Sequence, residues 1–202
     1  MESMRNTVVV YTDFICPWCY IGDHYLAPFI ASHNLNVDYV MYPLHPETPS
    51  QGLRLTELFA GRNMDIGNTQ NMIQQKAQSL GLAYTSRTHT YNSLNAQILG
   101  KYFASKQLFE PYKKALFHSY FGLAKDISNV SLLQELGSTI SGDTINISAI
   151  LNDELWKSQV QADWDRCRKD SITGIPTLYY QNHYCVGAQS SSTLETFFNS
   201  NH

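Results

Sequence analysis

Two of the four cysteines in this chain, Cys16 and Cys19, are separated only by Pro17 and Trp18. The residues before them, 7–14, are mostly β-branched or aromatic and include three consecutive valines, which predicts a strand buried on both faces. Apolar residues at helical spacing follow the pair, and Pro17 suits the first turn of a helix. The sequence therefore places both thiols where a strand ends and a helix begins.

A thiol pair at a helix N-terminus is suited to redox chemistry. The unpaired N–H groups and the positive end of the helix dipole favour thiolate over thiol, and the thiolate is the attacking species. We expect Cys16, first in the helix and nearer to solvent, to be the nucleophile. Cys19, one turn further along, is then the resolving thiol that attacks a mixed disulfide and releases the partner.

A structural disulfide, half of a zinc site and a pair of core cysteines are the alternatives. Closing so short a loop gains little stability. A zinc site needs two more ligands, and the nearest suitable residues, His183 and Cys185, lack the spacing of a zinc knuckle. No metal is therefore expected. Cys167 lies on the apolar stripe of a predicted helix, and we expect it and Cys185 to be packing residues.

A second candidate element lies near the C-terminus, where Gly174, Ile175 and Pro176 precede a predicted strand. Cis peptide bonds are nearly confined to bonds that precede proline. If this bond is cis, Ile175 presents its backbone N–H and C=O beside the sulfurs, where a substrate peptide could add as a short strand. Ile175 and Pro176 are thus candidate substrate-binding residues. An ordinary trans proline at an edge strand is the alternative.

The remaining elements follow from hydrophobic spacing and turn residues. A second strand is predicted at 37–42, and the chain from 54 to 171 is almost entirely helical in pattern. A hairpin follows over 178–186, with its turn at residues 182–183. A closing helix is expected to be capped by Ser191 or Ser192.

This order of elements predicts an α/β fold in which a βαβ unit and a ββα unit form one four-stranded mixed sheet with helices on its faces. The sheet domain is expected to consist of residues 1–52 and 172–202. Residues 53–171 are expected to form a large inserted all-helical domain. No repeat, linker run or low-complexity segment interrupts this pattern.

Composition excludes several classes of protein. The chain of 202 residues has 14 Lys and Arg against 17 Asp and Glu, a net charge of −3, so it has no basic field for nucleic acid. No apolar run reaches the length of a membrane span, and residues 1–6 lack the pattern of a signal peptide. We therefore expect no nucleic-acid or membrane partner and a cytoplasmic location.

Several motifs together resemble the DsbA-like thioredoxin superfamily, and more narrowly its FrnE-type branch. These are the CPWC motif, the Gly-Ile-Pro-Thr motif and the helical block between them; the similar segments are 14–22, 44–52, 91–96, 116–127, 174–177 and 187–189. The resemblance implies a thioredoxin-like fold and disulfide exchange through Cys16 and Cys19. The implied partner is a disulfide- or dithiol-bearing protein or small molecule. No cofactor is implied beyond redox exchange with glutathione or another thiol, and a homodimer is compatible with the sequence.

Two departures from the family pattern bear on mechanism. Val10 stands where many thioredoxin-like enzymes have a buried acid, so the proton of Cys19 must move through water or another group. Glutathione-using relatives, the kappa-class transferases and chromene carboxylate isomerases, usually have serine at the position of Cys16 and Gly-x-Asp-Arg at 187–190, which here reads Gly-Ala-Gln-Ser. Dithiol chemistry is therefore favoured. A glutathione-dependent isomerase or transferase, or a redox-inert chaperone or partner-binding module, remain the alternatives.

Overall fold

The computed structural model describes residues 6–200. The chain forms two compact units. The first combines the chain up to Tyr42 with the chain from Gln161 onward, and the second is Pro43–Val160. The predicted boundaries, after residues 52 and 171, both lie further along the chain.

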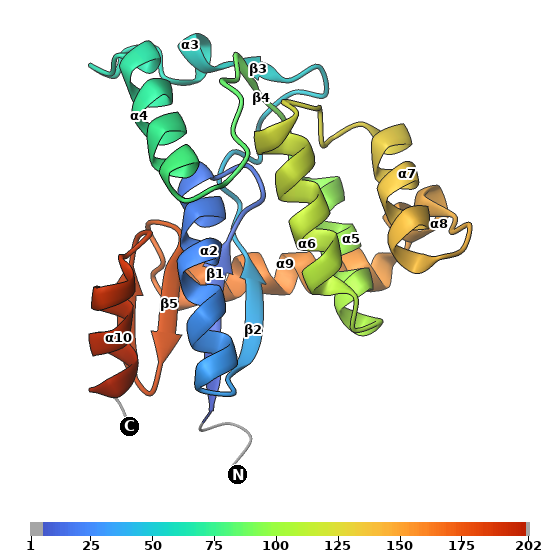
Figure 1. The fold of residues 1–202 in the computed structure, drawn as a ribbon. Coiled ribbons are helices and arrows are strands. Elements are labelled where there is room, and N and C mark those ends of the chain that lie inside the picture. Colours follow the sequence, from blue (N-terminus) through green and yellow to red (C-terminus); the bar gives the residue numbers. More distant parts are fainter. Residues whose placement is uncertain (1–5, 201–202) are drawn as a thin grey trace. The chain divides into compact units, whose positions relative to one another are not determined.

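The first unit is built on the predicted four-stranded mixed sheet, which the structure confirms, with strands in the order β2-β1-β5-β6 (Figure 1). Its strands are β1 (Thr7–Thr12), β2 (Asn36–Met41), β5 (Thr177–Tyr180) and β6 (His183–Val186). β1 pairs in parallel with β2 and antiparallel with β5, and Val10 lies opposite Leu178. β1 is thus a central strand that joins the two halves of this unit.

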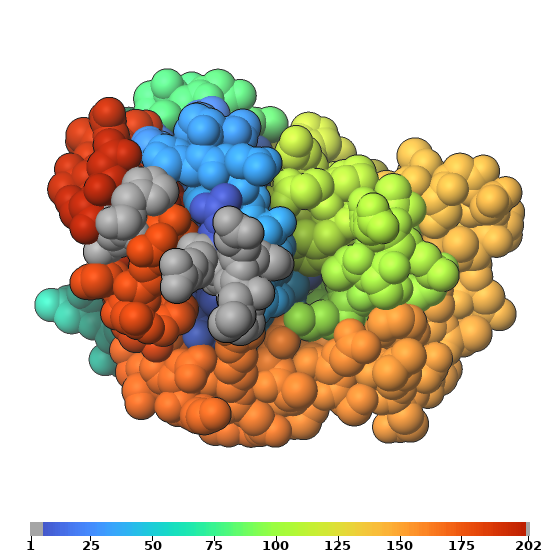
Figure 2. Space-filling view, turned by 90° about the horizontal axis from the view of Figure 1, so that it is seen from below, coloured from blue at the N-terminus to red at the C-terminus, as the bar shows by residue number. Residues whose placement is uncertain are grey.

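The three valines of β1 explain its central place. Val8 and Val10 belong to one buried apolar cluster, together with Leu178 of β5. Val9 belongs to a second cluster, with Val40 of β2, because successive side chains of a strand point to opposite faces. The exposed fractions of Val8, Val9 and Val10 are 0%, 7% and 5%; in the space-filling view the blue of the helix that follows β1 lies beside the red of the C-terminal helix (Figure 2). Such a strand stays in place because both of its faces are buried.

The helices of the first unit are α2 (Pro17–Ser32), α10 (Ser191–Asn199) and the C-terminal part of α9 (Glu154–Lys169). The rings of Phe29 in α2 and Phe198 in α10 stack with their centroids 5.7 Å apart. Phe198 is completely buried. α2 and α10 thereby cover the face of the sheet that carries Val8 and Val10.

A hydrogen bond and an ion pair hold the last turns of α9 against the edge strand β2. Asp163 accepts a hydrogen bond from the Met41 N–H at 2.8 Å, and Arg166 pairs with Asp38 at 2.6 Å. Cys167 is buried in the same cluster as Val9. These contacts explain why the chain joins the sheet unit from Gln161 onward.

The second unit is mostly helical, as predicted. Its helices are α3 (Leu55–Leu58), α4 (Ile66–Ser79), α5 (Leu94–Ser105), α6 (Phe109–Phe117), the π-helix η1 (His118–Gly122), α7 (Val130–Ser141), α8 (Ile147–Asn152) and the first part of α9. It also contains a short antiparallel ladder of β3 (Leu53–Arg54) and β4 (His89–Thr90), which the all-helical prediction missed. Two residues per strand are too few to produce an alternating pattern in the sequence.

Aromatic side chains fill the core of the second unit. The rings of Phe103 in α5 and Tyr112 in α6 stack at 4.7 Å between centroids. Both are completely buried, and the Tyr112 hydroxyl donates a hydrogen bond to the Ala96 carbonyl at 2.9 Å. Burial raises the pKa of Tyr112 well above its ordinary value. This phenol is therefore a neutral core group.

Candidate active site

Cys16 and Cys19 lie at the N-terminus of α2, as the sequence predicts. Cys16 is the N-cap residue, with an extended backbone (φ −87°, ψ 115°), and Pro17 begins the helix. The Cys19 N–H donates to the Cys16 carbonyl at 3.1 Å, and the Tyr20 N–H donates to the same oxygen at 3.3 Å. The first helical turn therefore brings the two cysteines together, with half-buried Pro17 and Trp18 between them.

The loop between β1 and α2 is ordered by Asp13. Its carbonyl accepts from the Cys16 N–H at 3.2 Å, and its side chain accepts from the Ile15 N–H at 3.3 Å. Asp13 is completely buried. The Cys16 side chain forms no cap hydrogen bond with the first turn of the helix.

The two thiols differ less in exposure than expected. Cys16 is 5% exposed and Cys19 is 2% exposed, so Cys16 is only slightly nearer to solvent. Burial and a hydrogen bond with the Cys16 side chain raise the pKa of Cys19 well above its ordinary value. A hydrogen bond with the Thr12 side chain and one with the Asp13 backbone act in the opposite direction. Cys19 therefore holds its proton at neutral pH.

The structure brings the loop of Ile175 and Pro176 to the cysteines, 159 residues along the chain from Cys16. Cys16 Sγ lies 3.7 Å from the Ile175 carbonyl oxygen, to which it donates. The peptide bond between Ile175 and Pro176 is cis. The Pro176 carbonyl accepts from the Gly187 N–H at 2.7 Å, and this bond fixes the loop to the chain that follows β6.

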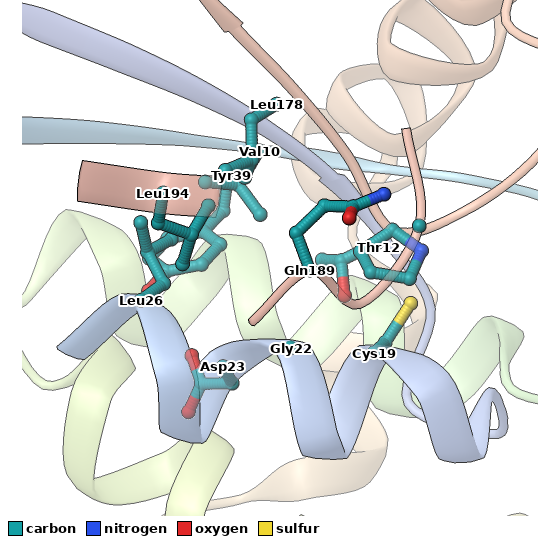
Figure 3. Close-up of a pocket in the computed structure, with 12 residues that line it drawn as sticks. Val10, Thr12, Cys19, Gly22, Asp23, Leu26, Tyr39, Leu178, Gln189 and Leu194 are labelled. Carbon is teal, nitrogen blue, oxygen red and sulfur yellow. The ribbon is translucent and has the colours of Figure 1, made fainter. Parts of the chain in front are cut away.

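A small cavity of about 20 Å³ lies beside Cys19, inside the first unit (Figure 3). Four of its lining residues have polar side chains besides the thiol: Thr12, Asp23, Tyr39 and Gln189. The other walls are Val10, Gly22, Leu26, Pro176, Leu178, Gly187 and Leu194. The sequence analysis made none of these four polar residues a candidate site residue. For Thr12 a signal was present, because it is two residues after Val10 and so on the same face of β1.

Cys167 and Cys185 lie outside this arrangement, in two different apolar clusters. Burial raises the pKa of both thiols, that of Cys167 to about 12. Within residues 6–200 no group of three or more His, Cys, Asp or Glu side chains could hold a metal ion. In the same part of the chain, no helix has both the length and the apolar character to cross a membrane.

The model of the DSBA-like thioredoxin domain matches residues 7–199. The chain belongs to this family. The mixed sheet with its helical part is accordingly a thioredoxin-like DsbA fold. Disulfide oxidoreductases are members of the DsbA-like family, and the cysteine pair lies at the strand-to-helix junction of this domain.

Three proteins illustrate the similarity. The curated protein "Uncharacterized protein YwbO" of Bacillus subtilis (strain 168) is 23% identical over 197 residues, which is 95% of each chain. The probable DsbA oxidoreductase SCO1869 of Streptomyces coelicolor superposes with a TM-score of 0.88 at 21% identity, covering 96% of this chain and 89% of that one. A 2-hydroxychromene-2-carboxylate isomerase gives a TM-score of 0.79 at 17% identity, covering 96% and 95%. These structural likenesses concern the fold.

Proposed function

We propose that this protein is a thiol–disulfide oxidoreductase of the FrnE-type branch that works in the cytoplasm through Cys16 and Cys19. The observation that carries the proposal is the position of the pair, with Cys16 as the uncapped N-cap of α2 and Cys19 one turn inward. A sulfur at this position receives the field of the helix dipole, which stabilises its thiolate. Buried Cys19, whose pKa is raised, waits as a thiol until Cys16 has reacted.

One half of the catalytic cycle consists of two successive thiol–disulfide exchanges, and a thiol such as glutathione completes the cycle by reducing the Cys16–Cys19 disulfide that they leave. The Cys16 thiolate attacks one sulfur of a substrate disulfide; the substrate S–S bond breaks, and one substrate sulfur leaves as a thiolate and takes a proton. Cys19 then loses its proton and attacks Cys16 Sγ. The mixed disulfide breaks, the second substrate thiolate is released, and two electrons have passed to the substrate. The reverse sequence oxidises a substrate dithiol.

Ile175 and Pro176 are proposed to hold the substrate. The Ile175 carbonyl lies 3.7 Å from Cys16 Sγ, so a peptide segment that pairs with this backbone has its own sulfur beside the nucleophile. Pro17 and Trp18, both half-buried, form the surface around the pair. The partner is a disulfide- or dithiol-bearing protein or small molecule, with glutathione as a thiol that exchanges with the pair.

Single cysteine variants test this proposal. With a model peptide disulfide, Cys19→Ser should stop turnover and accumulate a mixed disulfide on Cys16, seen as an adduct by mass spectrometry. Cys16→Ser should form no adduct. Turnover that survives Cys19→Ser would instead support a glutathione-dependent isomerase or transferase. If Cys16 forms no mixed disulfide in Cys19→Ser or in the unaltered protein, the proposal is refuted.

A further inference from the structure

The resolving step of the proposed cycle needs a route for one proton, and this inference rests on that proposed function. Cys19 is 2% exposed and must become a thiolate before it attacks Cys16. Residue 10, on the strand beside it, is Val10, whose side chain neither accepts nor donates a proton. A substitute for an acid at residue 10 must therefore come from the other residues that line the cavity beside Cys19.

Thr12 is the polar residue of β1 at this cavity. It is on the same face of the strand as Val10, two residues closer to the loop that leads to the cysteines. Its side chain is 5% exposed and forms a hydrogen bond with the Cys19 side chain. In the close-up, Thr12 and Cys19 lie at the same end of the cavity, with Gln189 over them (Figure 3). Because both residues are buried, water does not compete for this hydrogen bond, which lowers the pKa of Cys19.

The cavity can hold the other component that a proton route requires. Its volume of about 20 Å³ is enough for one water molecule. The walls offer that water hydrogen-bonding groups at Thr12, Cys19 and Gln189. Gln189 is half-buried and the next residue, Ser190, is exposed, so a proton that passes Gln189 comes close to solvent. A polar site of this size meets the usual requirements for a buried water.

We propose that the Thr12 hydroxyl is the positioning residue for Cys19, and that it works with one water in this cavity in place of an acid at residue 10. The cavity water accepts the proton of Cys19 Sγ and passes it to solvent past Gln189. The Thr12 hydroxyl donates a hydrogen bond to the sulfur as negative charge develops there. The thiolate then forms the bond to Cys16 Sγ, and the partner sulfur leaves with the electron pair of the broken bond.

The charged and titratable groups around Cys19 are few. Cys16 is on the same helix; it hydrogen-bonds with Cys19 and raises its pKa. The backbone of buried Asp13 has the opposite effect, as Thr12 does. Asp23 of α2 and Tyr39 of β2 also line the cavity. Thr12, which does not titrate, forms its hydrogen bond to Cys19 through a hydroxyl that Thr12→Val removes while the shape of the side chain is kept.

The test separates the two thiols by using DTNB, a chromogenic aromatic disulfide, as the substrate. Attack by Cys16 releases one thionitrobenzoate, and attack by Cys19 on the resulting mixed disulfide releases a second. Thr12→Val should slow the second release by about ten-fold at fixed pH, the effect of one pKa unit, and shift its pH profile upward. The first release should keep its rate. Thr12→Ser, which restores a hydroxyl, should return the second release toward that of the unaltered protein.

Thr90→Val is the matched control, because Thr90 is a buried threonine of the second unit, 3% exposed and bonded to Tyr120. It should leave both releases unchanged. An unaltered second release in Thr12→Val, or a Thr12→Ser protein as slow as Thr12→Val, would overturn the role of Thr12. The proposed function itself fails in a different case: the unaltered protein gives no second release, or Cys19→Ser still gives one. The two failures are therefore distinguishable.

Discussion

Replacing Gly22 with alanine tests how closely α2 packs against the Pro176 loop. A Cβ atom at Gly22 would lie 2.9 Å from Pro176 Cγ and 3.7 Å from Ala188 Cα. Carbon atoms pack at about 3.5 Å or more, so helix and loop must separate by about 0.6 Å. The proline ring cannot swing aside as a flexible chain end would. Overpacking lowers the free energy of unfolding by about 1–3 kcal/mol, and the higher helix propensity of alanine over glycine raises it by about 1 kcal/mol.

We therefore expect Gly22→Ala to lose about 1 kcal/mol of stability, which for a chain of this size lowers Tm by about 2–4 °C. Calorimetry or thermal melting followed by circular dichroism measures this. The same displacement moves the Ile175 carbonyl away from Cys16 Sγ, now 3.7 Å apart. Exchange with a peptide disulfide should slow as a result, whereas alkylation of Cys16 by a small reagent should not.

Gly137→Ala is the matched control, because the atoms that its new Cβ would approach belong to flexible side chains and not to a proline ring. A Cβ there would also approach within 2.9 Å, but of the terminal methyl groups of Ile145 and Ile147, which can turn away. It should leave peptide exchange unchanged and cost less stability than Gly22→Ala. A Gly22→Ala protein as stable as the unaltered one, with the same peptide exchange rate, would show that helix and loop are not in tight contact.

Two further predictions concern residues away from the cysteine pair. Burial raises the pKa of Cys167 to about 12, so at pH 8 only about one thiol in ten thousand is ionised, and iodoacetamide should label it in urea but not in the native protein. Above pH 9 the unfolded chain loses this proton first, so stability should fall with rising pH, and less steeply in Cys167→Ala; equal slopes would contradict this. Asn129 caps α7 by accepting from the N–H groups of Ser131 and Leu132 at 2.8 and 3.2 Å. Asn129→Ala should cost about 1 kcal/mol in urea unfolding, and exposed Asn71→Ala in α4 should cost nothing measurable; equal losses would argue against the cap.

Much of the sheet was predictable because its signals are local. The valines of β1 indicate a strand buried on both faces, and the structure places Val8 and Val9 in separate apolar clusters. The hairpin was predicted one residue too late. Its turn consists of Gln181 and Asn182, whose φ values of 46° and 68° are unusual for residues other than glycine, so composition did not mark the turn.

Helix boundaries show the same limit of local signals. Ser191 or Ser192 was expected to cap α10, but Ser190 is the cap and accepts from the Thr193 N–H at 3.3 Å. Three consecutive serines offer equivalent caps, and only the direction in which the chain leaves the sheet decides between them. β3 and β4 depend on pairing between distant residues and left no pattern in the sequence.

The candidate site divides in a similar way. Cys16 and Cys19 were predicted as site residues from their spacing, and Ile175 and Pro176 from a proline that follows Gly174-Ile175 at the start of a predicted strand. The sequence did not predict that Thr12 and Gln189 lie near Cys19, because this depends on how β1, α2 and the segment after β6 pack together. The close approach of Gly22 to Pro176 likewise exists only in three dimensions.

The position of β1 between β2 and β5 has a consequence for biosynthesis. β2 is available as soon as residue 41 has been made, but β5 begins at Thr177. At about 5–20 residues per second, a ribosome needs roughly 7–27 s to make the intervening chain. During this interval one edge of a three-valine strand has no partner, and the cysteines have no Pro176 loop beside them. The nascent chain therefore has both an unpaired strand edge, which is prone to aggregation, and an incomplete cysteine site. Its dependence on chaperones should be greatest while the second unit is being synthesised.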